Sequence, residues 1–373
     1  MRYRRTPIEI EAPESLGYDS IANNLAESSF ADMSLGEYGI DTDVGELLLQ
    51  YGDHRGVPAL REQIASDSDA VGADQVLVTS GAAPALFIVA TALLESGDHV
   101  LIEEPNYATN LETPRALAAE VEALPIRFED GWELDLERVE SMLRPETRLL
   151  SVTYPHNPTG AMIDADALDR LVAIVEAHPM ARLLVDETYR ELAFGEPLPV
   201  AAGLSPRVIS VSSMSKTYGL PGLRMGWLIT RDPELDETLL AAKEQILICG
   251  SAIDEEMAAR VLAARGRILP PIRTQVAEHL GIVRDWIVGQ DVFEWVEPRA
   301  GVVGMPRFRD PGAYDADRFH SSLLDDHGTY VGPGHWFDQP RTCFRLGYGW
   351  PQTDELRRGL DALLAAAADA RSG

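Results

Sequence analysis

Lysine is so scarce in this chain that each lysine requires an explanation. Of the 32 basic residues, only Lys216 and Lys243 are lysines. Lys216 follows the apolar run 207–213, and active side chains are often placed where a buried strand ends. A lysine amine held near apolar groups and another cation, here Arg224, loses affinity for its proton and becomes a nucleophile. Lys243 lies in a helical stretch, and we expect it to be a solvated surface residue.

The residues around Lys216 form a long and specific segment. The stretch from Ser213 to Trp227, SMSKTYGLPGLRMGW, resembles the lysine segment of class I/II aminotransferases, the fold-type I enzymes that use pyridoxal 5′-phosphate (PLP). The resemblance implies that Lys216 is the catalytic residue and holds PLP as a Schiff base. It also implies that Ser213, Ser215 and Arg224 bind the phosphate, because hydroxyl and guanidinium donors suit a phosphate dianion.

Two segments upstream resemble the parts of this family that contact the pyridine ring. Asp186 ends an apolar run, and its counterpart pairs with the protonated ring nitrogen; Tyr189 would hydrogen-bond the phenolic oxygen. Asn157, in an Asn-Pro-Thr-Gly turn, would donate to the same oxygen and reach the substrate carboxylate. Without the resemblance, Asp186 is a helix cap and Asn157 is a turn residue.

Earlier segments supply the remaining cofactor contacts that the resemblance implies. Ala82 and Ala83 begin a helix after an apolar run, and backbone N–H groups at such a helix start bind anions. Tyr107 corresponds to the aromatic residue that stacks on the ring. Tyr51 corresponds to a tyrosine that reaches the phosphate in the neighbouring subunit. The resemblance therefore implies a homodimer with shared active sites.

The substrate contacts are implied by two further segments. Arg345, in Cys343–Gly347, corresponds to the arginine that grips the substrate α-carboxylate through a bidentate contact. Gly36 corresponds to a loop glycine near the substrate. A second arginine for a side-chain carboxylate is not evident; candidates for that role are His54, Arg55 and Arg190. We therefore expect a broad or neutral amino acid as substrate.

The resemblance implies an aminotransferase that moves an amino group between an amino acid and a 2-oxo acid by a ping-pong mechanism. Related enzymes on the same scaffold are decarboxylases, lyases or cyclases, and the cofactor core does not separate them. The segments 155–158 and 218–224 also resemble capreomycidine synthase, a cyclising relative. Cyclisation or another reaction on an amino acid therefore remains the alternative.

The strands and helices that must position these residues can be predicted from alternating patterns in the sequence. Short apolar, β-branched runs alternate with helix-length segments, such as 84–95, 110–119 and 165–178. This alternation predicts an α/β fold with a mostly parallel sheet sandwiched by helices. The predicted strands are 75–80, 99–104, 120–126, 148–154, 182–187, 207–213 and 224–230.

The pattern changes along the last part of the chain and predicts a second domain. Residues 233–285 have a helical pattern; after about residue 285, short strands mix with helices, as in an α+β domain. We predict a large PLP-binding domain over residues 41–284. The small domain takes residues 1–40 and 285–373.

Composition excludes several other classes of function. The chain has 373 residues and a net charge of −28, so a nucleic acid is not expected as a partner. No apolar run is long enough to span a membrane, and no signal peptide is evident. Cys249 and Cys343 lie far apart, which predicts neither a disulfide nor a metal site but free thiols in the cytoplasm. The acidic, lysine-poor composition resembles that of halophilic proteins.

Overall fold

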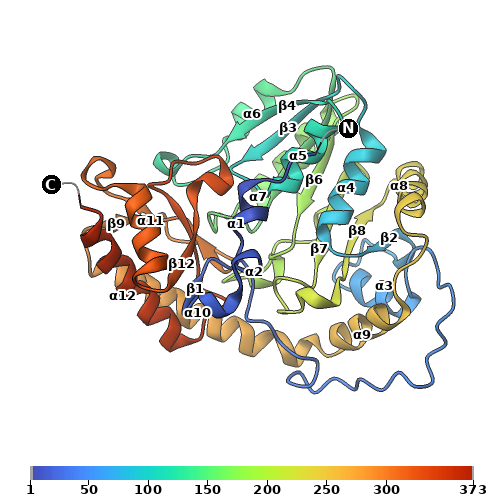
Figure 1. The fold of residues 1–373 in the computed structure, drawn as a ribbon. Coiled ribbons are helices and arrows are strands. Elements are labelled where there is room, and N and C mark those ends of the chain that lie inside the picture. The colour runs from blue at the N-terminus through green and yellow to red at the C-terminus, as the bar shows by residue number, and fades with distance from the viewer. Residues whose placement is uncertain (1–2, 372–373) are drawn as a thin grey trace.

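A seven-stranded sheet forms the centre of the larger part of the molecule, in the strand order β2-β8-β7-β6-β5-β3-β4 (Figure 1). The computed structural model describes residues 3–371. β8 runs antiparallel to both of its neighbours, and the other neighbouring pairs are parallel. The predicted α/β fold is therefore confirmed. The strands are β2 (Val76–Thr79), β3 (His99–Glu104), β4 (Glu120–Pro125), β5 (Thr147–Thr153), β6 (Arg182–Asp186), β7 (Val208–Ser213) and β8 (Gly226–Thr230).

Helices cover both faces of this sheet, because successive strand residues point to opposite sides. Leu149 packs with helices α4 (Ala82–Leu93), α5 (Ala108–Ala116) and α8 (Pro233–Ile246), whereas its neighbour Leu150 packs with α6 (Leu136–Met142) and α7 (Ala165–Ala177). Asp164 starts α7 by accepting a hydrogen bond from the Ala167 N–H at 2.8 Å. The apolar stripe of α7, which includes Leu171, then seals that face of the sheet.

A four-stranded sheet lies in the smaller part of the molecule, in the order β1-β12-β13-β10. The parallel pairing of β1 with β12 brings residues near the N-terminus into a sheet made mostly of C-terminal strands. The chain pattern predicted neither β1 nor β12. The strands are β1 (Asn23–Leu25), β10 (Val303–Gly304), β12 (Thr329–Pro333) and β13 (Phe344–Gly347), with β9 (Phe293–Glu294) paired to β11 (Arg307–Phe308).

Long helices pack around this second sheet and join it to the first. α11 (Ala316–Asp325) and α12 (Thr353–Asp369) pack on the four-stranded sheet, and α10 (Arg265–Val288) runs beneath both parts (Figure 1). α3 (Pro58–Ala65) and α9 (Ala252–Ala263) pack together beside β2. The exact division of the chain at residues 41 and 284 remains a prediction. None of the helices within residues 3–371 is long and apolar enough to cross a membrane.

Two very short helices at the start of the chain lie between the two sheets in Figure 1. They are α1 (Pro7–Glu11) and α2 (Pro13–Leu16). Glu11 fastens them to the smaller part, because its carboxylate contacts His335 Nε2 and accepts from Trp336 Nε1, each at 2.8 Å. The Tyr330 hydroxyl donates to the Glu11 carbonyl at 2.9 Å. The position of these helices is thus set by residues more than 300 positions away.

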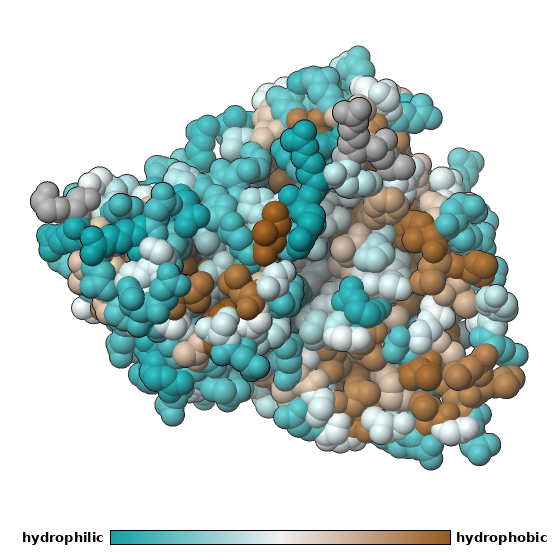
Figure 2. Space-filling model, in the orientation of Figure 1, coloured by the Kyte–Doolittle hydropathy of each residue, from teal (hydrophilic) through white to brown (hydrophobic). Residues whose placement is uncertain are grey.

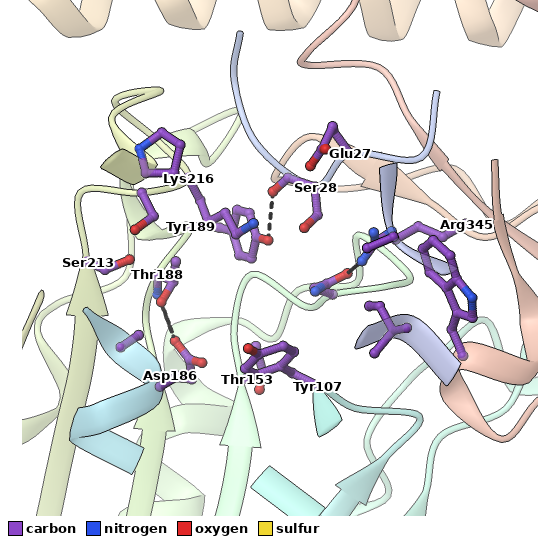
Figure 3. A pocket seen from close by; sticks show the side chains of 18 of the residues that line it. Glu27, Ser28, Tyr107, Thr153, Asp186, Thr188, Tyr189, Ser213, Lys216 and Arg345 are labelled. Atoms are coloured by element: carbon purple, nitrogen blue, oxygen red, sulfur yellow. Dashed lines mark hydrogen bonds between the residues drawn. The ribbon is translucent and has the colours of Figure 1, made fainter. Parts of the chain in front are cut away.

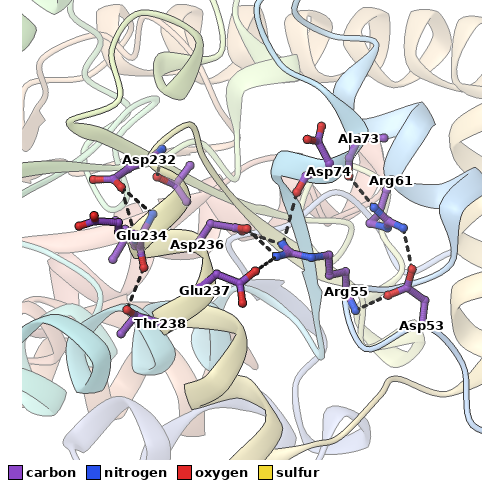
Figure 4. A network of polar contacts seen from close by, with 12 residues as sticks. Asp53, Arg55, Arg61, Ala73, Asp74, Asp232, Glu234, Asp236, Glu237 and Thr238 are labelled. Carbon is purple, nitrogen blue, oxygen red and sulfur yellow. Dashed lines mark hydrogen bonds and ion pairs between the residues drawn. The ribbon is translucent and has the colours of Figure 1, made fainter.

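Ion pairs fasten the loop before α3 to α8 (Figure 4). Arg55 pairs with Asp236 at 2.6 Å and with Glu237 at 2.9 Å, while Arg61 pairs with Asp53 at 2.8 Å. The same part of α8 corrects the expectation for Lys243. This lysine is only 1% exposed, and its ammonium donates to the His54 carbonyl instead of facing solvent.

Candidate active site

A cavity of about 360 Å³ lies at the carboxyl ends of the parallel strands, between the seven-stranded sheet and the smaller part of the chain. Parallel strands bring their carboxyl ends to one edge of a sheet, which is where α/β proteins bind ligands. The structure brings most of the predicted site residues to this cavity and leaves out Gly36 and Tyr51. The predicted residues that line it are Lys216, Ala82, Ala83, Tyr107, Asn157, Asp186, Tyr189, Ser213, Ser215, Arg224 and Arg345.

Asp186 is a buried carboxylate at the end of β6, on the sheet side of the cavity (Figure 3). Thr188 donates to Asp186 Oδ1 from its N–H at 3.1 Å and from its hydroxyl at 2.6 Å. Oδ2 has no hydrogen-bond partner within residues 3–371. Burial raises the pKa of Asp186, so the ionised form needs a positive partner in the cavity. A protonated pyridine nitrogen is a partner of that kind.

Lys216 projects into the cavity from the loop that follows β7 (Figure 3). Its carbonyl accepts the Phe30 N–H at 2.8 Å, and the Thr217 hydroxyl donates to the Thr188 carbonyl at 3.1 Å, so the loop is held at both sides. Lys216 Nζ makes no hydrogen bond to any residue that the structure describes. Burial lowers the pKa of Lys216, and Arg345 lowers it further, whereas Glu27 acts in the opposite direction. A free amine of lowered pKa is what a nucleophilic lysine requires.

Close contacts between backbone segments form a cradle at one end of the cavity. Gly81 has a φ of +106° and leads into the first turn of α4, where the Ala82 and Ala83 amides lie. A Cβ on Gly226 would lie only 2.8 Å from the Ala82 nitrogen. Arg224, itself left-handed at φ 51°, donates to the Ser80 carbonyl at 3.2 Å. Helix N–H groups, a guanidinium and the nearby Ser213 and Ser215 hydroxyls form a donor set that fits a phosphate.

Arg345 lies on β13 at the other end of the cavity and is only 4% exposed. Its Nη2 donates to the Ala26 carbonyl at 2.6 Å, and its Nη1 donates to Asn157 Oδ1 at 3.1 Å. Its Nε is buried and has no hydrogen-bond partner. A buried, unsatisfied donor on a cation requires an acceptor, and a substrate carboxylate is the acceptor that the clamp motif implies.

Tyr189 and Tyr107 flank the space between Asp186 and Arg345 (Figure 3). The Tyr189 hydroxyl donates to the Ser28 carbonyl at 2.8 Å, so the described structure gives it a partner on the N-terminal segment. Burial raises the pKa of Tyr189, so its hydroxyl stays protonated near neutral pH. Half-buried Tyr107 precedes α5 and presents the aromatic surface that stacking on a ring requires.

Gly36 is exposed in a surface turn and does not reach the cavity. This turn is closed by Glu37, whose carboxylate accepts the Ser34 N–H at 2.7 Å. The segment that does reach the cavity is Ala26–Ser28, which follows β1. Leu25-Ala26-Glu27 and Leu35-Gly36-Glu37 share the pattern leucine, small residue, glutamate, so the pattern alone could not choose between them.

Tyr51 and the alternative cationic candidates also lie outside the cavity lining. Tyr51 is 80% exposed, so within one chain it contacts no cofactor site. Arg55 is used in the ion pairs described above, and Arg190 pairs with Asp67 at 2.6 Å. His54 contacts Glu244 at 2.6 Å. None of the three is placed to bind a substrate side-chain carboxylate.

Several cavity residues escaped the sequence prediction, and most of them come from the start of the chain. Glu9 and Glu14 lie on α1 and α2, and Glu27 and Ser28 follow β1. These elements are too short to give a periodic pattern. Thr188 and Trp336 also line the cavity. Of these residues, only Thr188 could have been noticed from the local sequence, because it lies two positions after Asp186 at the end of β6.

A buried polar cluster supports the floor of the site below β3 and β5. Glu103 accepts the Thr153 N–H at 3.0 Å and the Tyr154 hydroxyl, and burial raises the pKa of Glu103 to about 8. His156 lies with its Nε2 3.7 Å from Glu103, and burial lowers the pKa of His156 to about 3. Both side chains are therefore mostly neutral near pH 7, and they fix the turn that carries Asn157.

Sequence comparison places this geometry in a known group of enzymes. The sequence profile described as aminotransferase class I and II matches residues 34–363. The chain belongs to this family. It is therefore an enzyme that uses PLP, and the phosphate cradle, the unpaired Asp186 oxygen and the free Lys216 amine all fit that cofactor. Within the part of the chain that the structure describes, no cluster of His, Cys, Asp and Glu side chains could hold a metal ion.

Two curated relatives cover most of the chain. It is 31% identical to capreomycidine synthase of Streptomyces vinaceus over 86% of this chain and 82% of that protein. It is 32% identical to arginine–pyruvate transaminase AruH of Pseudomonas aeruginosa over 77% of this chain and 74% of that protein.

Solved structures give the same picture of the fold. A PLP-dependent aminotransferase from Streptococcus suis superposes with a TM-score of 0.91 over 100% of both chains, at 29% identity. The PLP-dependent cyclase OrfR superposes with a TM-score of 0.89 over 99% of this chain and 98% of its own, also at 29% identity. Both a transaminase and a cyclase are thus found on nearly the same backbone.

Proposed function

We propose that this enzyme is an aminotransferase that moves an amino group between an amino acid and a 2-oxo acid by a ping-pong mechanism. The observation that supports the proposal best is that the free Lys216 amine lines the same cavity as the Asp186 carboxylate and the Arg345 guanidinium, whose Nε has no hydrogen-bond partner. A proton must be taken from the substrate Cα and delivered elsewhere on the bound molecule. A single base suffices for this reaction if it can reach both the Cα that loses the proton and the atom that receives it.

Each residue of the chain has a separate part in this reaction. Arg345 and Asn157 bind the α-carboxylate and so fix the direction of the Cα–H bond. Lys216 takes the Cα proton, which is why its pKa must lie below that of an ordinary lysine. Asp186 would hold the ring nitrogen, and the α4 cradle with Arg224 would hold the phosphate. PLP, when bound, supplies the electron sink that makes the Cα proton acidic.

Cyclisation of an amino acid is the second candidate function. It is favoured by the likeness to capreomycidine synthase and to the cyclase OrfR. The same wall of cofactor residues would serve either reaction, so the difference must arise on the substrate side of the cavity. Decarboxylation and elimination rest on no comparable likeness.

A single-turnover experiment separates these reactions. Purified holoenzyme is mixed with a panel of amino acids that contains representatives of each side-chain class. Transamination predicts the loss of the visible band of the lysine-bound cofactor, with one 2-oxo acid formed per site; a second 2-oxo acid then restores the band. Release of carbon dioxide or ammonia, or a cyclised amino acid as the product, would overturn the proposal.

We further propose that the enzyme is a homodimer in which Tyr51 reaches the partner's cofactor site. Apolar side chains gather over the loop before α3 and near the end of α8 (Figure 2). Leu48, Leu49 and Ile246 are 70%, 69% and 52% exposed, and exposed apolar side chains that gather on one surface are typical of a protein–protein interface. An interface between two copies would cover them. The cytoplasmic location and the adaptation to high salt remain predictions.

Mixed dimers test the sharing of sites. Chains carrying Tyr51→Ala and chains carrying Lys216→Ala are unfolded and refolded together, or co-expressed with separate tags. If each Tyr51 serves the partner's site, one of the two sites in a mixed dimer carries both changes and the other carries neither. Activity should then reappear in the mixed species. A monomer in sedimentation, or mixed dimers without recovered activity, would contradict the proposal.

A further inference from the structure

Three carboxylates in the active-site cavity have no role in the proposed transfer of the amino group. Glu9, Glu14 and Glu27 all line the cavity that contains Lys216 and Arg345. We infer that they bind the side chain of the substrate, and that this substrate is an amino acid whose side chain ends in a cation, a guanidinium or an ammonium group. This inference rests on the proposed function and names its substrate class.

The charges of the cavity support this inference when each is matched to a partner. The Arg224 guanidinium is matched by the cofactor phosphate, Asp186 by the ring nitrogen and Arg345 by the substrate carboxylate. Lys216 is consumed by its bond to the cofactor. The three glutamates are then left over, and a site with excess negative charge favours a positive ligand.

None of the three glutamates is neutralised by the protein itself. Within residues 3–371, none of them forms an ion pair with a basic side chain. The Glu9 carboxylate accepts the Thr6 N–H at 2.7 Å, and Glu27 accepts the Tyr18 hydroxyl at 3.1 Å. The Glu14 carboxylate accepts no hydrogen bond from any described residue. Hydrogen bonds from neutral donors orient a carboxylate but leave its charge in place.

Glu9, Glu14 and Glu27 together form a negative wall of the cavity. This wall lies close enough to Lys216 and Arg345 for a single substrate molecule to contact all of them. Glu27 and Glu14 each raise the pKa values of both Lys216 and Arg345, because their charges lie near these cations. Glu27 is half-buried, and in Figure 3 it lies on the segment across the cavity from Asp186. A side chain that extends from a Cα beside Lys216 therefore reaches this wall.

Arg345 provides independent evidence that the cavity fits a ligand with a negative charge at one end and a positive charge at the other. Its buried Nε lacks any hydrogen-bond partner and requires an anion. The glutamates offer a cation site on another side of the same cavity. An amino acid with a basic side chain carries both charges at the required ends. An acidic side chain would be repelled, and a neutral one would leave the three carboxylates without a partner.

The wall is also held in place, as a binding surface requires. Glu11, between Glu9 and Glu14 in the chain, is fixed by His335 and Trp336. The Tyr18 ring stacks on Trp350 at a centroid distance of 5.9 Å, which positions the hydroxyl that orients Glu27. The inferred basic substrate differs from the broad or neutral amino acid that the sequence led us to expect.

The test compares amino acids on the holoenzyme in single-turnover experiments, at an ionic strength of about 0.15 M. Arginine, ornithine and lysine should convert the cofactor band with a second-order rate constant at least tenfold above that of leucine or aspartate. Arginine and lysine arms distinguish a guanidinium from an ammonium site. If leucine or aspartate reacts as fast as any basic amino acid, the inference is overturned while the proposed aminotransferase stands. If no amino acid at all reacts, the proposed function falls first.

Neutralising variants locate the effect. Glu27→Gln and Glu14→Gln should each lower the ratio of arginine to leucine rate constants by about tenfold, in line with the loss of one charged contact. Glu62→Gln is the matched control, because Glu62 is exposed on α3 outside the cavity. The cofactor band of each variant verifies folding. Equal ratios in the cavity variants and in the control would contradict the inference.

Discussion

The active-site cavity has two walls that are built in different ways. The sheet wall carries Asp186, Ser213 and Thr153 at the ends of neighbouring strands, whose register fixes their spacing. The N-terminal wall carries Glu9, Glu14 and Glu27 on two helices of five and four residues and on the segment after a three-residue strand. The sheet wall is positioned by the packing of the hydrophobic core, whereas the N-terminal wall is positioned by a few side-chain contacts.

This difference separates the general part of the chemistry from the particular part. Residues at strand ends cannot move without disturbing the packing of Leu150, Leu183 and their neighbours. Such a wall suits the cofactor, which is the same for every substrate. The N-terminal wall can alter its charges without altering the core. A transaminase and a cyclase with the same backbone are therefore compatible with one cofactor wall and different substrate walls.

The largest effect is expected at the sheet wall, from Lys216→Ala. The variant should lose the visible cofactor band and at least about a thousandfold in amino-group transfer, because both the attachment point and the base are removed. Lys243→Ala is the control: this buried lysine lies outside the cavity, so the variant should keep the band. The spectrum of each purified protein gives the answer. A band that survives in Lys216→Ala would refute the central assignment.

Asp186→Asn tests the sheet wall without removing the lysine. An amide is neutral and cannot stabilise a protonated ring nitrogen, so the first-order rate of transfer should fall by about a hundredfold. The cofactor should still bind, because the cradle at Gly81 and Arg224 is untouched. Stopped-flow spectroscopy measures the rate, and equilibrium dialysis measures the affinity for PLP. An unchanged rate would show that the charge of Asp186 has no function.

Glu11→Gln weakens the N-terminal wall and leaves the sheet wall alone. The amide keeps one acceptor but loses the charge that holds His335, so α1 and α2 should become less firmly placed. We expect KM for a basic amino acid to rise by about threefold to tenfold, with kcat and the cofactor band little changed. Steady-state kinetics provide this split. A fall in kcat with constant KM would mean that the two walls are not separable.

The last effect concerns stability rather than catalysis, through the cluster under the sheet wall. Burial raises the pKa of Glu103 from 4.5 to about 8, so the folded protein holds a proton that the unfolded chain releases in this range. The contribution to stability is full below pH 4.5 and is lost as the pH rises to about 8, at up to about 1.4 kcal/mol per pH unit. Glu187, with a pKa raised to about 7, acts in the same direction.

Glu103→Gln should therefore flatten, but not abolish, the fall in stability between pH 4.5 and 8. His156 has the opposite sign: its pKa is lowered from 6.5 to about 3, so stability is lost as the pH falls below 6.5 in both proteins. Urea unfolding at a series of pH values measures both slopes. A variant with the same alkaline slope as the wild type would exclude Glu103 as a proton-binding group.

The two walls also differ in how well the sequence predicts them. Runs such as 99–104 and 182–187 have short apolar centres, and the strands β3 and β6 lie where these runs predict. The residues that follow these runs are then placed by the sheet itself. Lys216 and Asp186 could be assigned to one cavity for this reason, whereas Arg345 lies on β13 of the other sheet. The residues themselves were chosen by resemblance, and their proposed roles remain to be tested.

The N-terminal wall could not be predicted, because no local pattern determines it. β1 has three residues and gains its place by pairing Asn23 with Thr329 across the chain. Glu27 reaches the cavity only through that pairing, whereas Gly36, in a nearly identical local sequence, remains on the surface. Lys243 was misjudged for the same reason: its helical neighbours gave no sign of the loop that covers it.

The burial of Lys243 gives the protein an unusual labelling behaviour. One side-chain amine is enclosed beneath the loop at His54, and the other lies in the cavity, where PLP would block it under the proposed assignment. Amine-reactive dyes and crosslinkers should thus find no lysine on the folded surface, and trypsin should cut the unfolded chain almost wholly at arginines. Borohydride reduction would mark a single side chain. The rate at which an amine-reactive dye labels the protein therefore measures the rate of cofactor release and of unfolding.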